Sequence, residues 1–225
     1  MNTGESATAT HGAAPSGSPL FEFDAFLSYS TRGNYLLCRR IEAFLEGFHR
    51  RVDEGGRSLR PLQVCRDGSD FRQWLTGPTG QASDFVWQRI ESALRRCRRL
   101  LVVCSAESAA SPWVDREVAW MLQHRGADYV WLIIASGADP AGQPEGVVPP
   151  SAIAANLHNR QIWYDLRQWR GQRGEWVRDA EDEIVRLAVD LLELPADTQP
   201  GLAAVWQREE ARRARRMAQL AEIAP

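Results

Sequence analysis

Residues 111–118 read SPWVDREV, and they follow an apolar run with the composition of a buried strand. Ser111 is a favoured helix N-cap and Pro112 is favoured at the first helical position, so a helix is predicted to begin here. In that helix Trp113 and Glu117 are four residues apart and share one face. The stretch therefore predicts an indole beside a carboxylate near the start of a helix that follows a strand.

The rest of the chain repeats this alternation of strands and helices. Short apolar runs predict strands, and apolar residues at i, i+3, i+4 spacing predict helices. The expected strands are Phe23–Tyr29, Leu62–Cys65, Leu100–Cys104, Tyr129–Ala135 and an edge strand Gln161–Tyr164; the expected helices cover residues 37–48, Phe85–Cys97, Ser111–His124 and Val177–Leu192. Such alternation predicts an α/β fold in which helices cover both faces of a parallel sheet of about five strands, with a ligand crevice at the carboxyl ends of the strands.

Composition changes at both ends of this pattern. Residues 1–20 are rich in Ser, Thr, Gly, Ala and Pro and show no apolar period, which predicts a disordered leader. Residues 21–194 contain the α/β pattern and are expected to form one domain. Residues 195–225 are expected to form a linker and a connector helix, from about Leu202 to Ile223, that carries Arg212, Arg213, Arg215 and Arg216.

The charged residues exclude several classes of protein. All 27 basic residues are Arg, so chemistry that needs a lysine, such as Schiff-base formation or a phosphate-loop lysine, is excluded. A net charge of -2 gives no general attraction to nucleic acid or to anionic lipid. The four cysteines and four histidines lack metal-ligand spacing, so no metal site is expected. No signal peptide or membrane-spanning run is evident, which predicts a cytoplasmic protein.

A second motif lies near the N-terminus, where residues 23–30 read FDAFLSYS. Together with SPWVDREV, and in the same order within one α/β pattern, it resembles the Toll/interleukin-1 receptor (TIR) domain family in its bacterial form. The resemblance spans roughly Phe21 to Leu194 and implies a flavodoxin-like fold of three layers. Many bacterial TIR domains, and some eukaryotic ones, cleave nicotinamide from NAD. Trp113 and Glu117 match the WxxxE motif of the family, which implies that Glu117 is catalytic.

One carboxylate suits this reaction. Ordinary glycoside hydrolysis needs an acid to protonate the leaving oxygen, but the nicotinamide ring of NAD is already cationic and leaves as a neutral molecule. Negative charge beside the ribose can stabilise the oxocarbenium-like transition state. NAD is then the substrate, and no further cofactor is expected. Beside Glu117, the residues expected to bind the substrate are Trp113, Tyr29, Ser30, Arg32 and Ser105.

Two long loops separate the predicted elements. In the family, the loop that corresponds to Asp67–Ser83 mediates self-association and gates the active site, which implies that Phe71 and Trp74 contribute to contacts between copies. The second loop, Gly137–Pro150, is rich in Gly and Pro and is expected at the surface. The resemblance also implies that the C-terminal helix leads to a sensor domain or to another partner.

The resemblance implies an effector of bacterial, anti-phage immunity that produces nicotinamide and either ADP-ribose or its cyclic form. Two alternatives stay open at this point. The chain can be a non-catalytic scaffold that acts through TIR–TIR contacts, as family adaptors do. It can also be a module that binds NAD without cleaving it.

Overall fold

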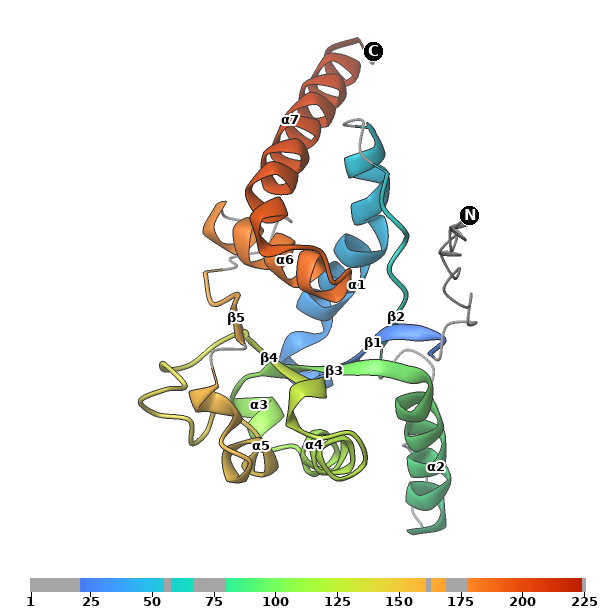
Figure 1. The fold of residues 1–225 in the computed structure, drawn as a ribbon, viewed down its shortest axis with the longest axis vertical. Helices are drawn as coiled ribbons and strands as arrows, with labels where there is room; N and C mark the ends of the chain where they lie inside the picture. The colour runs from blue at the N-terminus through green and yellow to red at the C-terminus, as the bar shows by residue number, and fades with distance from the viewer. Residues whose placement is uncertain (1–20, 55–57, 67–79, 161–162, 169–177, 224–225) are drawn as a thin grey trace, which may run out of the picture.

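The computed structural model describes residues 21–54, 58–66, 80–160, 163–168 and 178–223. The predicted leader and the loop residues Phe71 and Trp74 lie outside these ranges. A parallel sheet with the strand order β2-β1-β3-β4-β5 forms the centre of the fold (Figure 1). Its strands are β1 (Phe23–Ser28), β2 (Val64–Arg66), β3 (Cys97–Cys104), β4 (Val130–Ile134) and β5 (Trp163–Asp165). The predicted α/β fold with a five-stranded parallel sheet is therefore confirmed.

Helices cover both faces of this sheet. The α-helices are α1 (Thr31–Glu54), α2 (Gly80–Arg96), α3 (Ala106–Ala109), α4 (Pro112–His124), α5 (Pro150–Ala154), α6 (Arg178–Leu191) and α7 (Gln199–Ile223), and short 3-10 turns occupy Ala127–Tyr129, Leu157–Asn159 and Ala196–Thr198. Helices α1, α6 and α7 pack in one hydrophobic layer, and α2, α4 and α5 pack in the other (Figure 1). Within the described ranges, every helix is too short or too polar to cross a membrane.

The central strands are apolar because both of their faces are covered. Every residue of β4, sequence VWLII, is buried, as expected for a strand between two helical layers. Strand β3 begins at Cys97, three residues before the predicted start at Leu100, because Cys97 pairs with Phe23 of β1. Arg98 and Arg99 therefore lie on this strand.

Alternation along β1 decides which residues face which layer. Ala25 and Leu27 belong to the core under α1, together with Tyr29, whereas Phe26 belongs to the core on the α4 side. Successive side chains of a strand point to opposite faces, so Ser28 faces the same side as Phe26. Chain order reverses between β1 and β3, and at such a switch point open α/β sheets bind their ligands. A ligand site is therefore expected at the carboxyl end of β1.

Helix α2 and the loop before α5 also differ from the sequence-based expectation. Helix α2 begins at Gly80, five residues before the predicted Phe85. The sequence did not predict its first turn because that turn is polar and gives no apolar period. The loop expected at the surface, Gly137–Pro150, contributes buried Val147 and Val148 to the core. Gly137 adopts φ 99°, and a Cβ there would lie 2.4 Å from Val147 Cγ2, so the packing of Val147 requires glycine at this position.

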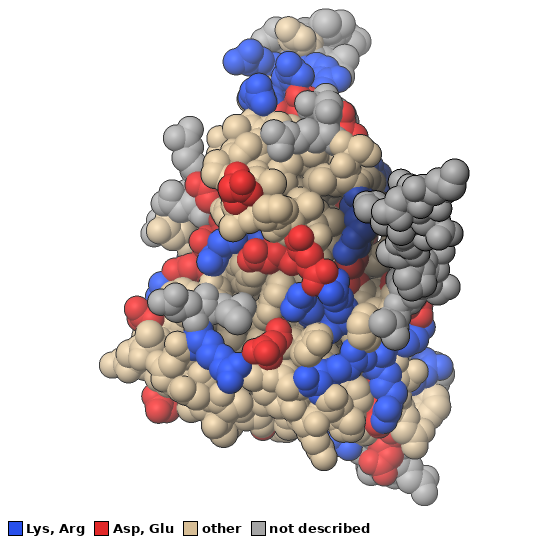
Figure 2. All heavy atoms as spheres, viewed as in Figure 1, with Lys and Arg blue, Asp and Glu red and all other residues tan. Residues whose placement is uncertain are grey.

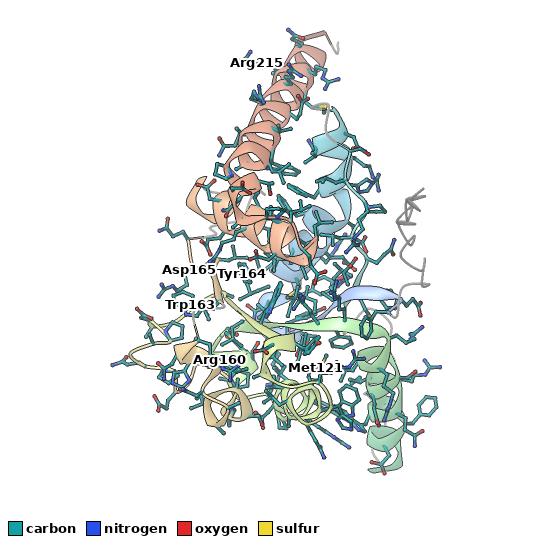
Figure 3. All side chains as sticks on the ribbon, viewed as in Figure 1. Met121, Arg160, Trp163, Tyr164, Asp165 and Arg215 are labelled. Atoms are coloured by element: carbon teal, nitrogen blue, oxygen red, sulfur yellow. The ribbon has the colours of Figure 1, made fainter. Side chains whose placement is uncertain are left out.

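The C-terminal helix is half docked and half exposed. Leu202, Val205 and Trp206 are buried. The ring centroid of Trp206 lies 4.4 Å from the ring centroid of Phe44 on α1. The hydrophobic core therefore extends past Leu194, where the domain was predicted to end. The outer half of α7 is exposed and carries basic side chains, including Arg215 (Figures 2 and 3).

Candidate active site

Buried polar side chains gather at the switch point. The structure describes six buried polar or charged residues, and five of them belong to the carboxyl end of β1, the segment after β3, or the helices that follow: Ser28, Asn34, Ser105, Ser108 and Glu117. The sixth, Glu209, is on α7. Buried polar groups cost free energy unless they are hydrogen-bonded, so such a concentration marks a specialised part of the fold.

Helix α4 is held firmly at its start. Ser111 caps it by accepting a hydrogen bond of 3.4 Å from Val114 N, and Pro112 occupies the first turn, as predicted from the sequence. The carboxylate of Asp115 accepts a bond of 2.7 Å from Ser151 N, which ties α4 to α5. Met121, labelled in Figure 3, is fully buried between α4 and the sheet. These contacts fix the orientation of the helix that carries Trp113 and Glu117.

Glu117 is fully buried, and Ser28 Oγ donates a hydrogen bond to its Oε2 atom. The sequence alone shows no structural partner for this carboxylate, and the structure provides one in Ser28. A helical wheel places a residue only relative to its own helix, and it does not show that β1 ends beside Glu117. Trp113, on the same face of α4, is partly buried and packs against the core on the α4 side.

Four residues form a second polar cluster, which we call the β1–β3 clasp: Ser30, Asn34, Ser105 and Ser108. Asn34 Nδ2 donates to Ser105 Oγ at 2.8 Å and to Ser108 Oγ at 3.4 Å. Ser30 N donates to Ser108 Oγ at 3.1 Å. The clasp therefore joins the start of α1 to α3 and holds together the segments that follow β1 and β3.

The clasp explains the position of Ser105. This side chain is fully buried and is the N-cap of α3, accepting a hydrogen bond from Ser108 N. Its hydroxyl also donates to Glu107 Oε2 at 2.9 Å. These bonds give Ser105 a structural role within the protein, and its contact with substrate stays a prediction.

The sequence of the chain is similar to a known family and to a known protein. Residues 55–135, which include the SPWVDREV stretch, match a family model described as "Thoeris protein ThsB, TIR-like domain". The chain is also 27% identical over 179 residues to "NAD(+) hydrolase ApTIR" from an Actinoplanes species. Together these matches support assignment of the chain to the TIR domain family.

The alignment covers 75% of this chain but only 23% of ApTIR. This chain therefore spans about a quarter of the length of that relative. Among solved structures, the TIR domains of the activated Roq1 resistosome, which directly recognises the pathogen effector XopQ, are 14% identical to it. That match covers 75% of this chain and 99% of the Roq1 chain, with a TM-score of 0.39.

The structure does not bring Tyr29 of this TIR domain to Glu117. Tyr29 is buried in the core under α1, on the opposite side of the sheet, and its hydroxyl accepts a hydrogen bond of 3.3 Å from Arg66. Arg66 in turn pairs with Glu42 at 2.7 Å. The reason is the alternation of β1, which turns neighbouring residues to opposite faces.

Arg32 is the predicted site residue with the most accessible charge. It is exposed on the first turn of α1, and no described carboxylate forms an ion pair with it. An exposed guanidinium at the carboxyl edge of the sheet suits a phosphate group, because its donors form a fork that matches phosphate oxygens. Ser30, one residue before α1, is partly buried, and its backbone bond to Ser108 places it within the clasp.

Sequence reasoning missed three residues of this TIR site: Ser28, Asn34 and Ser108. Ser28 was within the quoted FDAFLSYS motif, but an apolar strand covered on both faces gives no alternation that assigns its side chain to a layer. The only local signal for Ser108 was its position three residues after Ser105, which is the spacing of an N-cap and its partner. Asn34 had no signal, because its partners are 71 and 74 residues away.

Other chemistry at this edge is limited. Cys104, at the end of β3, is fully buried, and burial raises the pKa of its thiol well above the usual range. A protonated thiol is a poor nucleophile at neutral pH. In the part of the chain that the structure describes, no group of three or more His, Cys, Asp or Glu side chains is arranged to hold a metal ion. Compared with the Cys104 thiol and with a metal site, the carboxylate of Glu117 is therefore the better candidate for a catalytic group at this edge.

Proposed function

We propose that this TIR domain is an NAD glycohydrolase and that Glu117 is its catalytic carboxylate. One observation carries the proposal: the Glu117 side chain, held by Ser28, lies at the switch point between β1 and β3. Ligands of open α/β sheets bind at that place. The similarity to a protein named NAD(+) hydrolase supports the same reaction.

The reaction needs little from the protein beyond charge and position. As the bond between ribose and nicotinamide breaks, the pyridinium ring takes the bonding electrons and leaves as a neutral molecule, while positive charge develops on the ribose. A preorganised carboxylate stabilises that charge most effectively where water is excluded. The buried setting of Glu117 provides such an environment.

The remaining groups have roles in binding. Trp113 provides an apolar wall on the face of α4 that carries Glu117. Arg32 attracts the pyrophosphate of NAD from its exposed position at the start of α1. Because Glu117 has no exposed surface, the groups that cover it must move aside before NAD reaches the carboxylate.

The biological role forms part of the same proposal. The resemblance to bacterial TIR effectors supports a role in anti-phage immunity, in which the loss of NAD or its product is the signal. Water that attacks the ribose carbon gives ADP-ribose, whereas adenine that attacks the same carbon gives a cyclic product. Which one forms depends on the group that reaches this carbon first.

One observation favours a second candidate, a non-catalytic TIR scaffold. A buried carboxylate that bonds a strand-end hydroxyl can also serve only to stabilise the fold. In that case the chain acts through contacts between TIR domains, and Glu117 never meets a substrate.

Chromatography of NAD incubated with concentrated protein separates these candidates. We expect free nicotinamide to accumulate in proportion to time and protein. NAD that stays intact but co-elutes with the protein would indicate an NAD-binding module, and NAD that is neither cleaved nor bound would indicate the scaffold. Either of these two results would contradict the proposed function.

A further inference from the structure

We infer that Ser28 is a positioning residue for the reaction, because its hydroxyl holds the carboxylate of Glu117 in one orientation. The inference rests on the proposed function of Glu117. It concerns a residue that acts through Glu117 and need not touch the substrate itself.

Ser28 is held rigidly by the backbone on both sides of it. It is the last residue of β1, a strand paired on both sides, and its Cα pairs with that of Val102 on β3. Two residues later, Ser30 is bound to Ser108 through the clasp. Since the backbone is fixed on both sides of Ser28, its hydroxyl is a fixed donor.

The location of this hydroxyl also points to Glu117 as its partner. Ser28 is fully buried and faces the layer that contains Phe26 and α4, where the surrounding residues are mainly apolar. A buried hydroxyl costs free energy unless it forms a hydrogen bond. Among the described residues, the side chain that it bonds is Glu117. The polar side chain at this position is therefore explained by its bond to the carboxylate.

The carboxylate of Glu117 gains a defined rotation from this bond. The terminal torsion of a Glu side chain is broad, so packing alone does not fix which way the two oxygens face. A hydrogen bond from Ser28 to Oε2 distinguishes the two oxygens and selects one rotation. Catalysis by charge placement is sensitive to such geometry, and a displacement of about 1 Å can lower a rate by about 100-fold.

The test compares Ser28→Ala with Ser28→Thr in the otherwise unchanged chain. Ser28→Ala removes the donor, and we expect kcat for nicotinamide release to fall roughly 10- to 100-fold while KM stays within about twofold. Ser28→Thr retains the hydroxyl, so we expect it to recover most of the lost kcat. Cys38→Ala is the matched control, because it also removes one buried heavy atom but lies in the opposite core layer. It should leave both constants unchanged.

A kinetic cycle adds a readout that a merely structural role would not move. If Ser28 acts through Glu117, then Ser28→Ala should have little further effect on the residual rate of Glu117→Gln. Equal losses in both backgrounds would overturn the inference. So would a folded Ser28→Ala variant with kcat within twofold of wild type, or a loss that appears only in KM. A wild-type protein that releases no nicotinamide would overturn the proposed function, and this inference with it.

Discussion

Asn34 Nδ2 donates a hydrogen bond of 2.8 Å to Ser105 Oγ, and this bond joins the first turn of α1 to the N-cap of α3. Both side chains are buried, although they are 71 residues apart in the chain. The bond holds together the two segments between which the candidate site lies. Its loss should therefore affect both stability and activity.

Asn34→Ala should lower the free energy of unfolding by about 1–3 kcal/mol, because Ser105 and Ser108 lose a buried donor. Urea denaturation followed by circular dichroism measures the change. Asn159, which is exposed, provides the matched control, and its replacement by Ala should change stability by about 0.5 kcal/mol or less. Equal stabilities of the two variants would contradict the structural role of the clasp.

The cysteines should differ in their reactivity towards alkylating reagents. Burial raises the pKa of the Cys104 and Cys38 thiols, so both stay protonated at pH 8 and are shielded from reagent. Cys65 is only partly buried and should react first in the native protein. Mass spectrometry of peptides after brief treatment with iodoacetamide reports each site. Rapid alkylation of Cys104 under native conditions would show that the end of β3 is open to solvent.

Helix α7 should contribute to stability through its first half. Trp206→Ala should destabilise the protein by about 3–5 kcal/mol, because the indole packs on Phe44 and beneath the guanidinium of Arg51. The Cζ atom of Arg51 lies 5.1 Å from the centroid of the Trp206 ring. Removal of the chain after Arg212 should cost little, since residues Ala214–Gln219 are exposed. Urea denaturation compares the two variants. A large loss on truncation, or none for Trp206→Ala, would contradict this division of the helix.

Activity should depend on protein concentration if copies complete one another's sites, as the family resemblance implies. We expect the specific activity for nicotinamide release to rise across a dilution series, together with the mass measured by light scattering. The segment predicted to make these contacts, with Phe71 and Trp74, lies outside the described residues. Constant specific activity from a protein that stays monomeric throughout would exclude this requirement.

The sequence predicted the fold well because strands and helices differ in their apolar period. Elements with a strong period, such as α4 and β4, were located to within one or two residues. Helices α3 and α5 have four and five residues, too few to show a period, and neither was expected. The early start of β3 at Cys97 depends on pairing with Phe23, which no local pattern records.

The candidate site was predictable only in part, for a related reason. The spacing of Trp113 and Glu117 is local, so the sequence placed both side chains on one face of α4. The bond between Ser28 and Glu117 connects residues 89 positions apart and becomes visible only in the folded chain. Tyr29 was expected at the site because it lies at the carboxyl end of the first predicted strand, yet strand alternation places it on the other side of the sheet.

The most direct test of the central claim is the rate of nicotinamide release by Glu117→Gln, which removes the charge but preserves the shape of the side chain. Glu145→Gln, at an exposed position, is the matched control and should keep the wild-type rate. With circular dichroism confirming that both variants are folded, we predict that Glu117→Gln is slower than wild type by about 100-fold or more. A folded Glu117→Gln variant that retains more than half of the wild-type rate would contradict the assignment of Glu117 as the catalytic carboxylate.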